Sequence, residues 1–173
     1  MAIRGELVGT DLSGPPETGN PASIRQETWP ASLAESATEV FSMMVGAEVT
    51  AAESEIRVVA EVTGVIGIAG AFRGIFSLRC TTSSAIKIAA QMLGIPPEEA
   101  AAQRADAIGE ICNIIAGHFK DKIGFGDKCM LTVPTVVEGK DYRIVRPGGE
   151  CRKIELAFLY AGEPFRIALE TRV

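Results

Sequence analysis

The chain has 173 residues, of which 47% are hydrophobic, so it fits one globular domain with an ample core rather than a disordered chain. Its net charge of −5 and pI near 5.0 argue against nucleic acid as the main partner, because phosphate binding requires clustered Lys and Arg. The four cysteines are far apart and the chain has one histidine, so we expect no zinc site and interpret the cysteines as small buried hydrophobes in a reducing compartment.

No targeting segment or membrane span is evident in the sequence. Residues 1–6 lack the apolar core of a signal peptide, and the most apolar stretch, residues 58–78, is interrupted by an acid, an arginine and four glycines. We therefore expect a cytoplasmic protein without a membrane partner. Residues 1–28 are rich in Gly, Pro, Ser and Thr, which predicts a flexible N-terminal tail and leaves residues 29–173 as the domain.

The secondary-structure elements are predicted in the order helix, strands, two helices, strands. Hydrophobic periodicity and boundaries at Gly, Pro, Ser and Thr predict three helices: residues 30–45, a second that starts within 81–84 and ends at 93, and a third of about 25 residues at 97–123. Strands are predicted at 56–63, within 66–80 (one long or two short), and at 128–133, 135–137, 142–145, 152–160 and 165–173. We expect Gly64 to end the first strand. Short turns between the last strands imply antiparallel pairing. The expected fold class is α+β, with two pseudo-symmetric helix-plus-antiparallel-strand halves and long helices packed on a β-sheet.

The run from Asp106 to Gly117 is the most informative part of the long helix. At about 100° per residue, Asp106, Glu110, Asn113 and Gly117 share one stripe. A polar stripe is commonly just a solvated face, but Gly109 and Gly117 each cost a helix about 1 kcal/mol relative to Ala, which a merely solvated face has no reason to accept. We therefore interpret the stripe as a functional site. The opposite face is apolar and expected to be buried: Ile108, Ile111, Cys112, Ile115 and Phe119.

The pattern Asp106-x3-Glu110-x2-Asn113, followed about twenty residues later by Pro134 in the motif Pro-x-Val-x-x-Gly, resembles the CheC/CheX/FliY family of chemotaxis phosphatases. The resemblance extends from about Trp29 to the C-terminus. Glu-x-x-Asn alone would be weak, and the spaced proline, the long helix and the order of elements make the resemblance fairly specific.

The first predicted helix carries a second copy of the pattern in degenerate form. Glu35, Glu39 and Ser42 have the equivalent spacing, with serine at the position of the asparagine. One intact copy and one degenerate copy are most similar to the CheX branch of the family. The resemblance to that branch also implies a homodimer.

The resemblance implies hydrolysis of the aspartyl phosphate of a response-regulator receiver domain, such as phospho-CheY, in chemotaxis or another two-component pathway. The regulator would bring the phosphoryl group, a Mg²⁺ and a lysine, and this chain would bind no cofactor or metal. Glu110 and Asn113 would be the catalytic residues. Asp106, Gly109 and Gly117 would contact the partner, the two glycines by keeping the helix face low.

The residue types suit this chemistry independently of the resemblance. A phosphoryl transition state needs a water held in line and charge neutralised more than it needs covalent help. The carboxamide of Asn113 offers a donor and an acceptor and does not titrate, so it can orient a water beside an anion. Glu110 can pair with a lysine of the regulator and fix the docking register.

Two other functions stay open at this point. The chain could be a non-catalytic receiver-binding or flagellar-switch-like module of the same fold, or a structural domain with no receiver partner. In the first case Asn113→Ala would leave the lifetime of receiver phosphate unchanged, and in the second no phosphorylated receiver would bind. An unrelated enzyme is disfavoured, because no Ser/His/Asp set, Gly-rich phosphate loop or HExxH motif is present.

Overall fold

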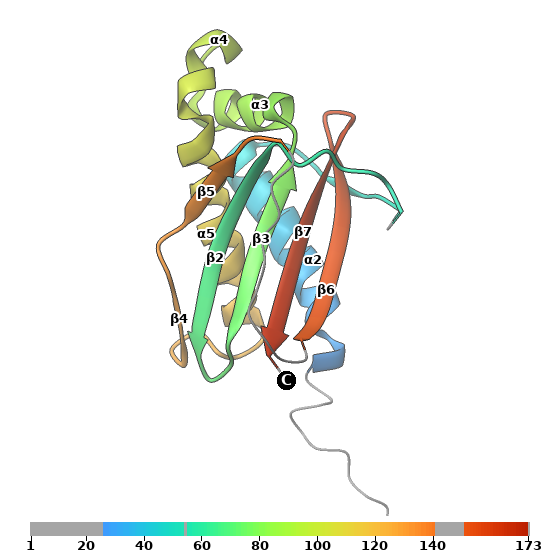
Figure 1. Ribbon diagram of the computed structural model, residues 1–173, viewed down its shortest axis with the longest axis vertical. Helices are drawn as coiled ribbons and strands as arrows, with labels where there is room; N and C mark the ends of the chain where they lie inside the picture. Colours follow the sequence, from blue (N-terminus) through green and yellow to red (C-terminus); the bar gives the residue numbers. More distant parts are fainter. Residues whose placement is uncertain (1–25, 54, 141–150, 173) are drawn as a thin grey trace, which may run out of the picture.

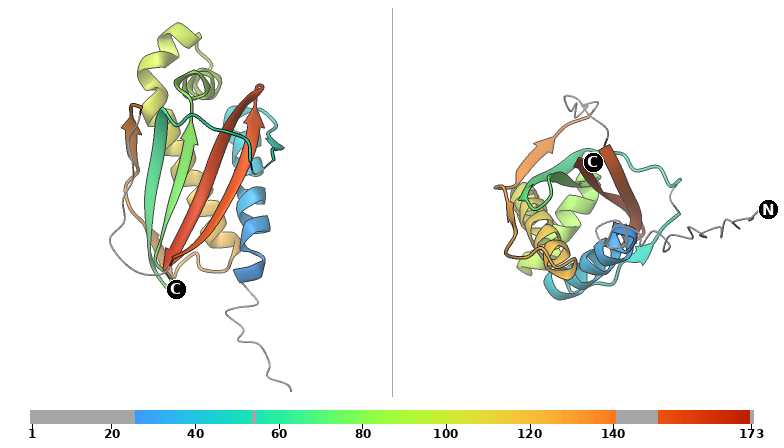
Figure 2. Two further views of the ribbon diagram at one scale, coloured as in Figure 1. Left: turned by 45° about the vertical axis from the view of Figure 1, so that its right-hand side comes forward. Right: turned by 90° about the horizontal axis from the view of Figure 1, so that it is seen from below.

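A computed structural model describes residues 26–53, 55–140 and 151–172. In this part of the chain a seven-stranded antiparallel sheet carries two long helices, α2 and α5, on one face, and α3 lies across one end (Figures 1 and 2). The helices are α2 (Trp29–Val40), continued by a π-helical turn η1 (Phe41–Val45), α3 (Thr82–Leu93), α4 (Pro97–Ala100) and α5 (Arg104–Lys122). The strands are β1 (Thr50–Ala51), β2 (Val62–Gly70), β3 (Gly74–Cys80), β4 (Cys129–Leu131), β5 (Thr135–Glu138), β6 (Cys151–Tyr160) and β7 (Glu163–Arg172).

The sheet has the predicted two-fold pseudo-symmetry. Its order is β1-β6-β7-β3-β2-β4, and β5 also pairs with β2, so β3 and β7 are central and antiparallel to each other. The halves exchange their edge strands: β1 of the first half pairs with β6, while β4 and β5 of the second half pair with β2. The α+β architecture with helices on one face of the sheet is therefore confirmed.

Two helices end where the sequence predicts. The first, α2 with its π-helical turn, stops at Gly46, which is left-handed with φ 64°. The helix α3 begins after Thr81, whose hydroxyl accepts the Ser84 N–H at 3.0 Å, and it stops at Gly94, also at φ 64°. Glycine at these positions has no Cβ to strain the left-handed backbone, so both stops follow from composition.

The continuous helix predicted for 97–123 is wrong, because a 3₁₀ turn at Ala101–Gln103 separates α4 from α5. The turn lets α4 fold back beside α3, where Ala89, Ala100 and Ala107 form a small buried cluster of their own. These three alanines are also compatible with one face of a continuous helix, so the local sequence does not reveal the bend.

The strand predicted for 56–63 is also wrong. Residues 52–53 and 55–61, which we call the strap, have no regular secondary structure apart from bends and turns, and β2 begins at Val62 with Gly64 inside it. The alternation seen in the sequence is real, since Ile56, Val58 and Ala60 are half-buried and the residues between them are more exposed. The strap is an extended chain that crosses one end of the sheet and, among the described residues, makes backbone hydrogen bonds to the strands only at its two ends, Ala52 and Glu61 (Figure 1).

The C-terminal strands match the predictions closely. The turn between β6 and β7 uses Ala161 and Gly162, both with positive φ (49° and 78°), as a two-residue hairpin requires. The predicted strand at 142–145 lies outside the described residues, as does most of the predicted tail (residues 1–25). None of the helices in the described part of the chain is long and apolar enough to cross a lipid bilayer.

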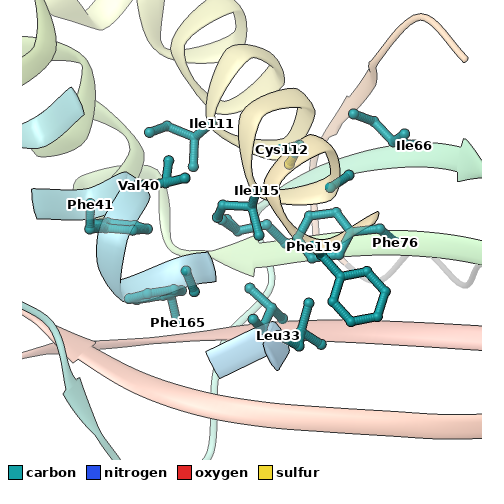
Figure 3. Close-up of a cluster of buried hydrophobic side chains, with 14 of the residues drawn as sticks. Leu33, Val40, Phe41, Ile66, Phe76, Ile111, Cys112, Ile115, Phe119 and Phe165 are labelled. Carbon is teal, nitrogen blue, oxygen red and sulfur yellow. The ribbon is translucent and has the colours of Figure 1, made fainter. Parts of the chain in front are cut away.

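The predicted apolar face of α5 forms the centre of the core. Figure 3 shows part of this face, including Cys112 and Phe119, packed between α2 and the sheet, and all five predicted side chains are fully buried. Cys129 is buried as well, whereas Cys151 is exposed, so the expectation of four buried cysteines is wrong for that one. Burial raises the pKa of the Cys80 thiol to about 12 and also raises the pKa of Cys112, so both are core residues rather than nucleophiles.

Glu163, at the start of β7, joins the β6–β7 hairpin to the N-terminus of α3. Its carboxylate accepts from the hydroxyls of Thr81 (2.8 Å), Ser83 (2.9 Å) and Ser84 (2.8 Å) and forms an ion pair with Lys87. The Lys87 hydrogen bond, followed by those of the hydroxyls, holds the pKa of Glu163 at about 2 against an ordinary 4.5. We expect Glu163→Gln to lower the free energy of unfolding by about 2 kcal/mol at pH 7.

Because the folded-state pKa is lowered, this contribution is complete above pH 4.5 and is lost as the pH falls towards 2. Urea unfolding of wild type and Glu163→Gln between pH 7 and pH 2.5 should therefore show a stability gap that closes with acid. Glu48→Gln, an exposed acid after η1, should show little effect throughout. A gap for Glu163→Gln that stays constant with pH would mean that its charge is not the source.

Candidate active site

Helix α5 lies between α2 on one side and the β4–β5 connection on the other, with its apolar face on the sheet (Figure 2). Strand β2 comes very close to it at Gly64: a Cβ at this glycine would be 2.3 Å from Cys112 Sγ and 3.1 Å from Ile108 Cγ2. Because glycine has no side chain, α5 can pack directly against the backbone of β2 at this point. Asn113 follows Cys112 directly, so this contact also sets the height of the predicted catalytic residue above the sheet.

The predicted stripe is the part of α5 that faces outward. Asp106 and Glu110 are exposed, and Asn113 and Gly117 are half-exposed. Within residues 26–53, 55–140 and 151–172, the side chains of Asp106, Glu110 and Asn113 make no hydrogen bond or ion pair. The stripe thus presents two carboxylates and one carboxamide that are available to another molecule.

The other charged side chains of α5 are engaged within the chain. Arg104 binds Glu138 of β5, with Nε 2.7 Å from Oε1 and Nη2 donating to Oε2 at 3.1 Å. Lys120 donates to the carbonyl of Gly126 at 2.6 Å, and Lys122 bridges to α2. Because polar groups elsewhere on the same helix find partners, the unpaired stripe is a local property and not a general feature of α5.

Pro134 borders the stripe from the β4–β5 connection. Gly109 is buried, and a Cβ built on it would meet Pro134 Cβ at 3.4 Å and Val136 Cγ2 at 3.6 Å. The glycine therefore lets the proline ring approach the helix backbone, while Gly117 has open space where a side chain would be. The structure thus places Pro134 against Gly109, the residue before Glu110, although the two segments are far apart in sequence.

The ion pair between Arg104 and Glu138 was not evident from the sequence. This pair fastens the end of β5 to the start of α5 and so holds the connection that carries Pro134. Glu138 lies inside the Pro-x-Val-x-x-Gly motif, but nothing in the sequence indicated its partner. Two exposed apolar side chains, Met130 and Val133, lie on the same edge at 75% and 84% exposure.

The acidic side chains of the degenerate copy on α2 are paired with side chains of α5. Lys122 Nζ lies 3.2 Å from Glu35 Oε2 and 2.9 Å from Glu39 Oε1, and His118 Nδ1 lies 3.7 Å from Glu39 Oε2. The hydrogen bond from Lys122 lowers the pKa of Glu39 and keeps it charged. Ser42 is exposed at the end of this group. The two copies therefore differ in residue type and also in their contacts, because the acids on α2 are paired within the chain and those of the stripe are not paired with any described residue.

The arrangement is suited to completing the site of another molecule. The described residues contain no group of three or more His, Cys, Asp or Glu side chains that could hold a metal ion. A carboxamide can position a water, and a carboxylate one helical turn away can pair with a cation, but neither is an activated nucleophile. The reacting group would have to be brought to the stripe from outside.

Comparisons with known proteins agree on one family. A family model described as chemotaxis phosphatase CheX matches residues 62–158, a span that includes the stripe and Pro134. No curated protein matches the sequence. The solved structure of chemotaxis protein CheX from Vibrio vulnificus is similar, with 25% identity and a TM-score of 0.68, over 82% of this chain and 97% of that chain.

Two further solved structures share the fold. CheX from Desulfovibrio desulfuricans is 23% identical with a TM-score of 0.69, over 83% of this chain and 99% of that one. A CheX-CheY-BeF3-Mg²⁺ complex from Borrelia burgdorferi is 20% identical with a TM-score of 0.69, over 84% and 98% of the two chains.

Proposed function

The chain belongs to the CheX family of chemotaxis phosphatases, and we propose that it hydrolyses the aspartyl phosphate of a CheY-like response-regulator receiver domain. The observation that carries the proposal is the unpaired stripe: Glu110 and Asn113 have no partner among the described residues, while other charged groups of the same helix do. The Borrelia burgdorferi structure, a CheX with CheY, supports a receiver as the partner.

In this proposal Asn113 orients the attacking water. Its carboxamide is half-exposed and lies beside the low surface formed by Gly109 and Pro134, so a phosphoryl group on a docked receiver can reach it. The amide oxygen accepts a hydrogen bond from the water, and the N–H₂ group donates one to a phosphoryl oxygen. Holding the water in line lowers the entropic part of the barrier, and an uncharged amide adds no repulsion to the anion.

Glu110 serves as the docking anchor. It is exposed one turn before Asn113, and its carboxylate can form a charge-assisted hydrogen bond with the receiver's lysine. This contact fixes the register of the receiver, so that Asn113 faces the phosphoryl group. The receiver's Mg²⁺ would neutralise phosphoryl charge, and this chain supplies no ligand to it.

Asp106 and Gly117 form the surface on which the receiver rests. Gly109, which was also expected to contact the partner, is buried beneath Pro134 and acts only by seating the proline. Asp106 lies one turn before Glu110, Gly117 leaves open space one turn after Asn113, and Gly109 seats Pro134. We further propose that the chain acts in the cytoplasm as a homodimer. Among the described residues, β4 and β5 form one edge of the sheet, and the exposed apolar side chains there support an association of two copies.

The proposal is tested by following the loss of phosphate from a receiver encoded near this chain, with and without the protein. An unchanged phosphate lifetime with every such receiver contradicts it. Binding to a receiver carrying BeF3 separates the alternatives. A non-catalytic receiver-binding or flagellar-switch-like module binds this complex and leaves the phosphate lifetime unchanged, whereas a structural domain does not bind.

Gly117→Ala is expected to raise stability while it weakens contact with the receiver. The added Cβ meets no atom within 4 Å, and alanine is the better helix former, so we expect the free energy of unfolding to rise by about 0.5–1 kcal/mol. We expect the same variant to slow receiver dephosphorylation several-fold, because the methyl group lies where the receiver approaches. Urea unfolding and the phosphatase assay measure the two effects. A stabilised variant with full activity would remove Gly117 from the proposed contact surface.

A further inference from the structure

The strap borders an open cavity on the face of the sheet opposite α2 and α5. The cavity has a volume of about 540 Å³, which is within the range of small-molecule pockets, about 300–1,000 Å³. Three half-buried apolar side chains of the strap, Ile56, Val58 and Ala60, form one wall. Figure 1 shows the strap in teal where it crosses the end of the sheet, and no residue of α5 lines the cavity.

Arg166 of β7 holds the strap over this cavity. Its Nη2 donates to the carbonyl of Ile56 at 2.6 Å, and its Nη1 donates to Glu155 of β6 at 2.6 Å. The strap is also tied at both ends by backbone hydrogen bonds, from Ala52 N–H to the Ala157 carbonyl and from Glu61 N–H to the Cys80 carbonyl. This wall of the cavity is therefore held at three places.

Arg79 of β3 lines the same cavity and is the exact register partner of Arg166 across the β3–β7 pair. Like charges directly opposite each other in a sheet are unfavourable, so this pairing costs stability unless an anion compensates it. Glu155 compensates Arg166. Across residues 26–53, 55–140 and 151–172, the guanidinium of Arg79 has no hydrogen bond or ion pair.

The charge of the lining favours an anion. Three arginines (Arg57, Arg79 and Arg166) face two glutamates (Glu55 and Glu155), which leaves a net charge of +1 in a chain whose overall charge is −5. Arg79 is half-exposed and its planar fork matches an oxyanion in a bidentate way. The apolar wall of the strap suits a ligand that also has an apolar part.

We propose that this cavity binds a small organic anion, with its phosphate or carboxylate group held by Arg79 and its apolar part against the strap. The site is separate from the stripe on α5, and its occupation does not depend on phosphatase activity. A bound anion would compensate Arg79 as Glu155 compensates Arg166.

Calorimetric titration of the purified full chain tests the proposal. The probes are phenyl phosphate and benzoate, with phenol as the uncharged control of similar shape. We expect saturable binding of one or both anions, none of phenol, and binding weakened about tenfold or more by Arg79→Gln, as expected for the loss of a charge-assisted bidentate contact. Arg73→Gln, which removes an exposed arginine from the β2–β3 turn, should change the affinity less than twofold.

The two anions distinguish the ligand source: a preference for phenyl phosphate indicates a phosphate-bearing ligand, and a preference for benzoate a carboxylate-bearing one. Arg79→Lys keeps the charge without the planar fork and should retain part of the affinity. Thermal unfolding should show that Arg79→Gln is at least as stable as wild type, because it relieves the opposed charges. The proposal is overturned by absence of saturable binding to either anion, or by equal losses in Arg79→Gln and Arg73→Gln.

Discussion

Asn113→Ala is expected to slow receiver dephosphorylation by about 100-fold or more, the usual cost of removing one group that acts only in the transition state. The fold should be unaffected, because the Asn113 side chain is half-exposed and makes no hydrogen bond within the described residues. The measurement is the rate of phosphate loss from a labelled receiver with each variant. Binding to the BeF3-loaded receiver should be nearly retained, since Glu110 still docks it.

Ser42→Ala is the matched control for this prediction. Ser42 lies in η1, the continuation of α2, at the position that corresponds to Asn113 in α5, and it is exposed, so its loss should leave the rate unchanged. The result that contradicts the assignment is an Asn113→Ala protein that dephosphorylates the receiver at the wild-type rate. A loss of binding equal to the loss of rate would instead make Asn113 a docking residue.

Gly64→Ala is expected to destabilise the protein by about 2–3 kcal/mol, as overpacking of a well-filled core does. The new Cβ would lie 2.3 Å from Cys112 Sγ, a fully buried atom that cannot move away without shifting α5. Because Asn113 is the next residue on that helix, receiver dephosphorylation should fall as well. Urea unfolding measures the first effect, and the phosphatase assay under conditions where the variant is folded measures the second.

A double-mutant cycle locates the clash. Cys112→Ala alone should cost about 1–2 kcal/mol for the small cavity that it leaves. In that background Gly64→Ala should cost less than about 1 kcal/mol, because the sulfur that it meets is gone and Ile108 Cγ2 at 3.1 Å is the next contact. Gly117→Ala, which is expected to raise the free energy of unfolding, is the control that a glycine-to-alanine change does not destabilise the protein in itself. Additive costs for the Gly64 and Cys112 changes would mean that the close approach is relaxed elsewhere.

The features that the sequence predicted correctly are those that local chemistry determines. The buried face of α5 follows from the spacing of its isoleucines, the ends of α2 and α3 follow from Gly46 and Gly94, and the hairpin after Tyr160 follows from Gly162. The stripe was visible because polar residues at helical spacing lie opposite a complete apolar face. Each of these depends on residues close together in the chain.

The features that the sequence did not predict depend on tertiary contacts. The strap alternates between half-buried and exposed residues as a strand does. A strand also needs a neighbouring strand to pair with, and the sequence around Val58 cannot show whether one is in place. The break between α4 and α5 depends on the packing of Ala100 against α3. The pairing of Arg104 with Glu138 and the contact of Gly109 with Pro134 join segments that only the fold brings together.

Catalytic turnover tests most directly the claim that the chain is a receiver phosphatase. The protein is added to a phosphorylated receiver at about one-tenth of the receiver's concentration, and phosphate release is followed until the receiver is exhausted. We predict that the wild type releases several equivalents of phosphate per molecule, well above the spontaneous rate, and that Asn113→Ala releases phosphate near the spontaneous rate. Binding of the BeF3-loaded receiver without any acceleration of phosphate release by the wild type would contradict the claim.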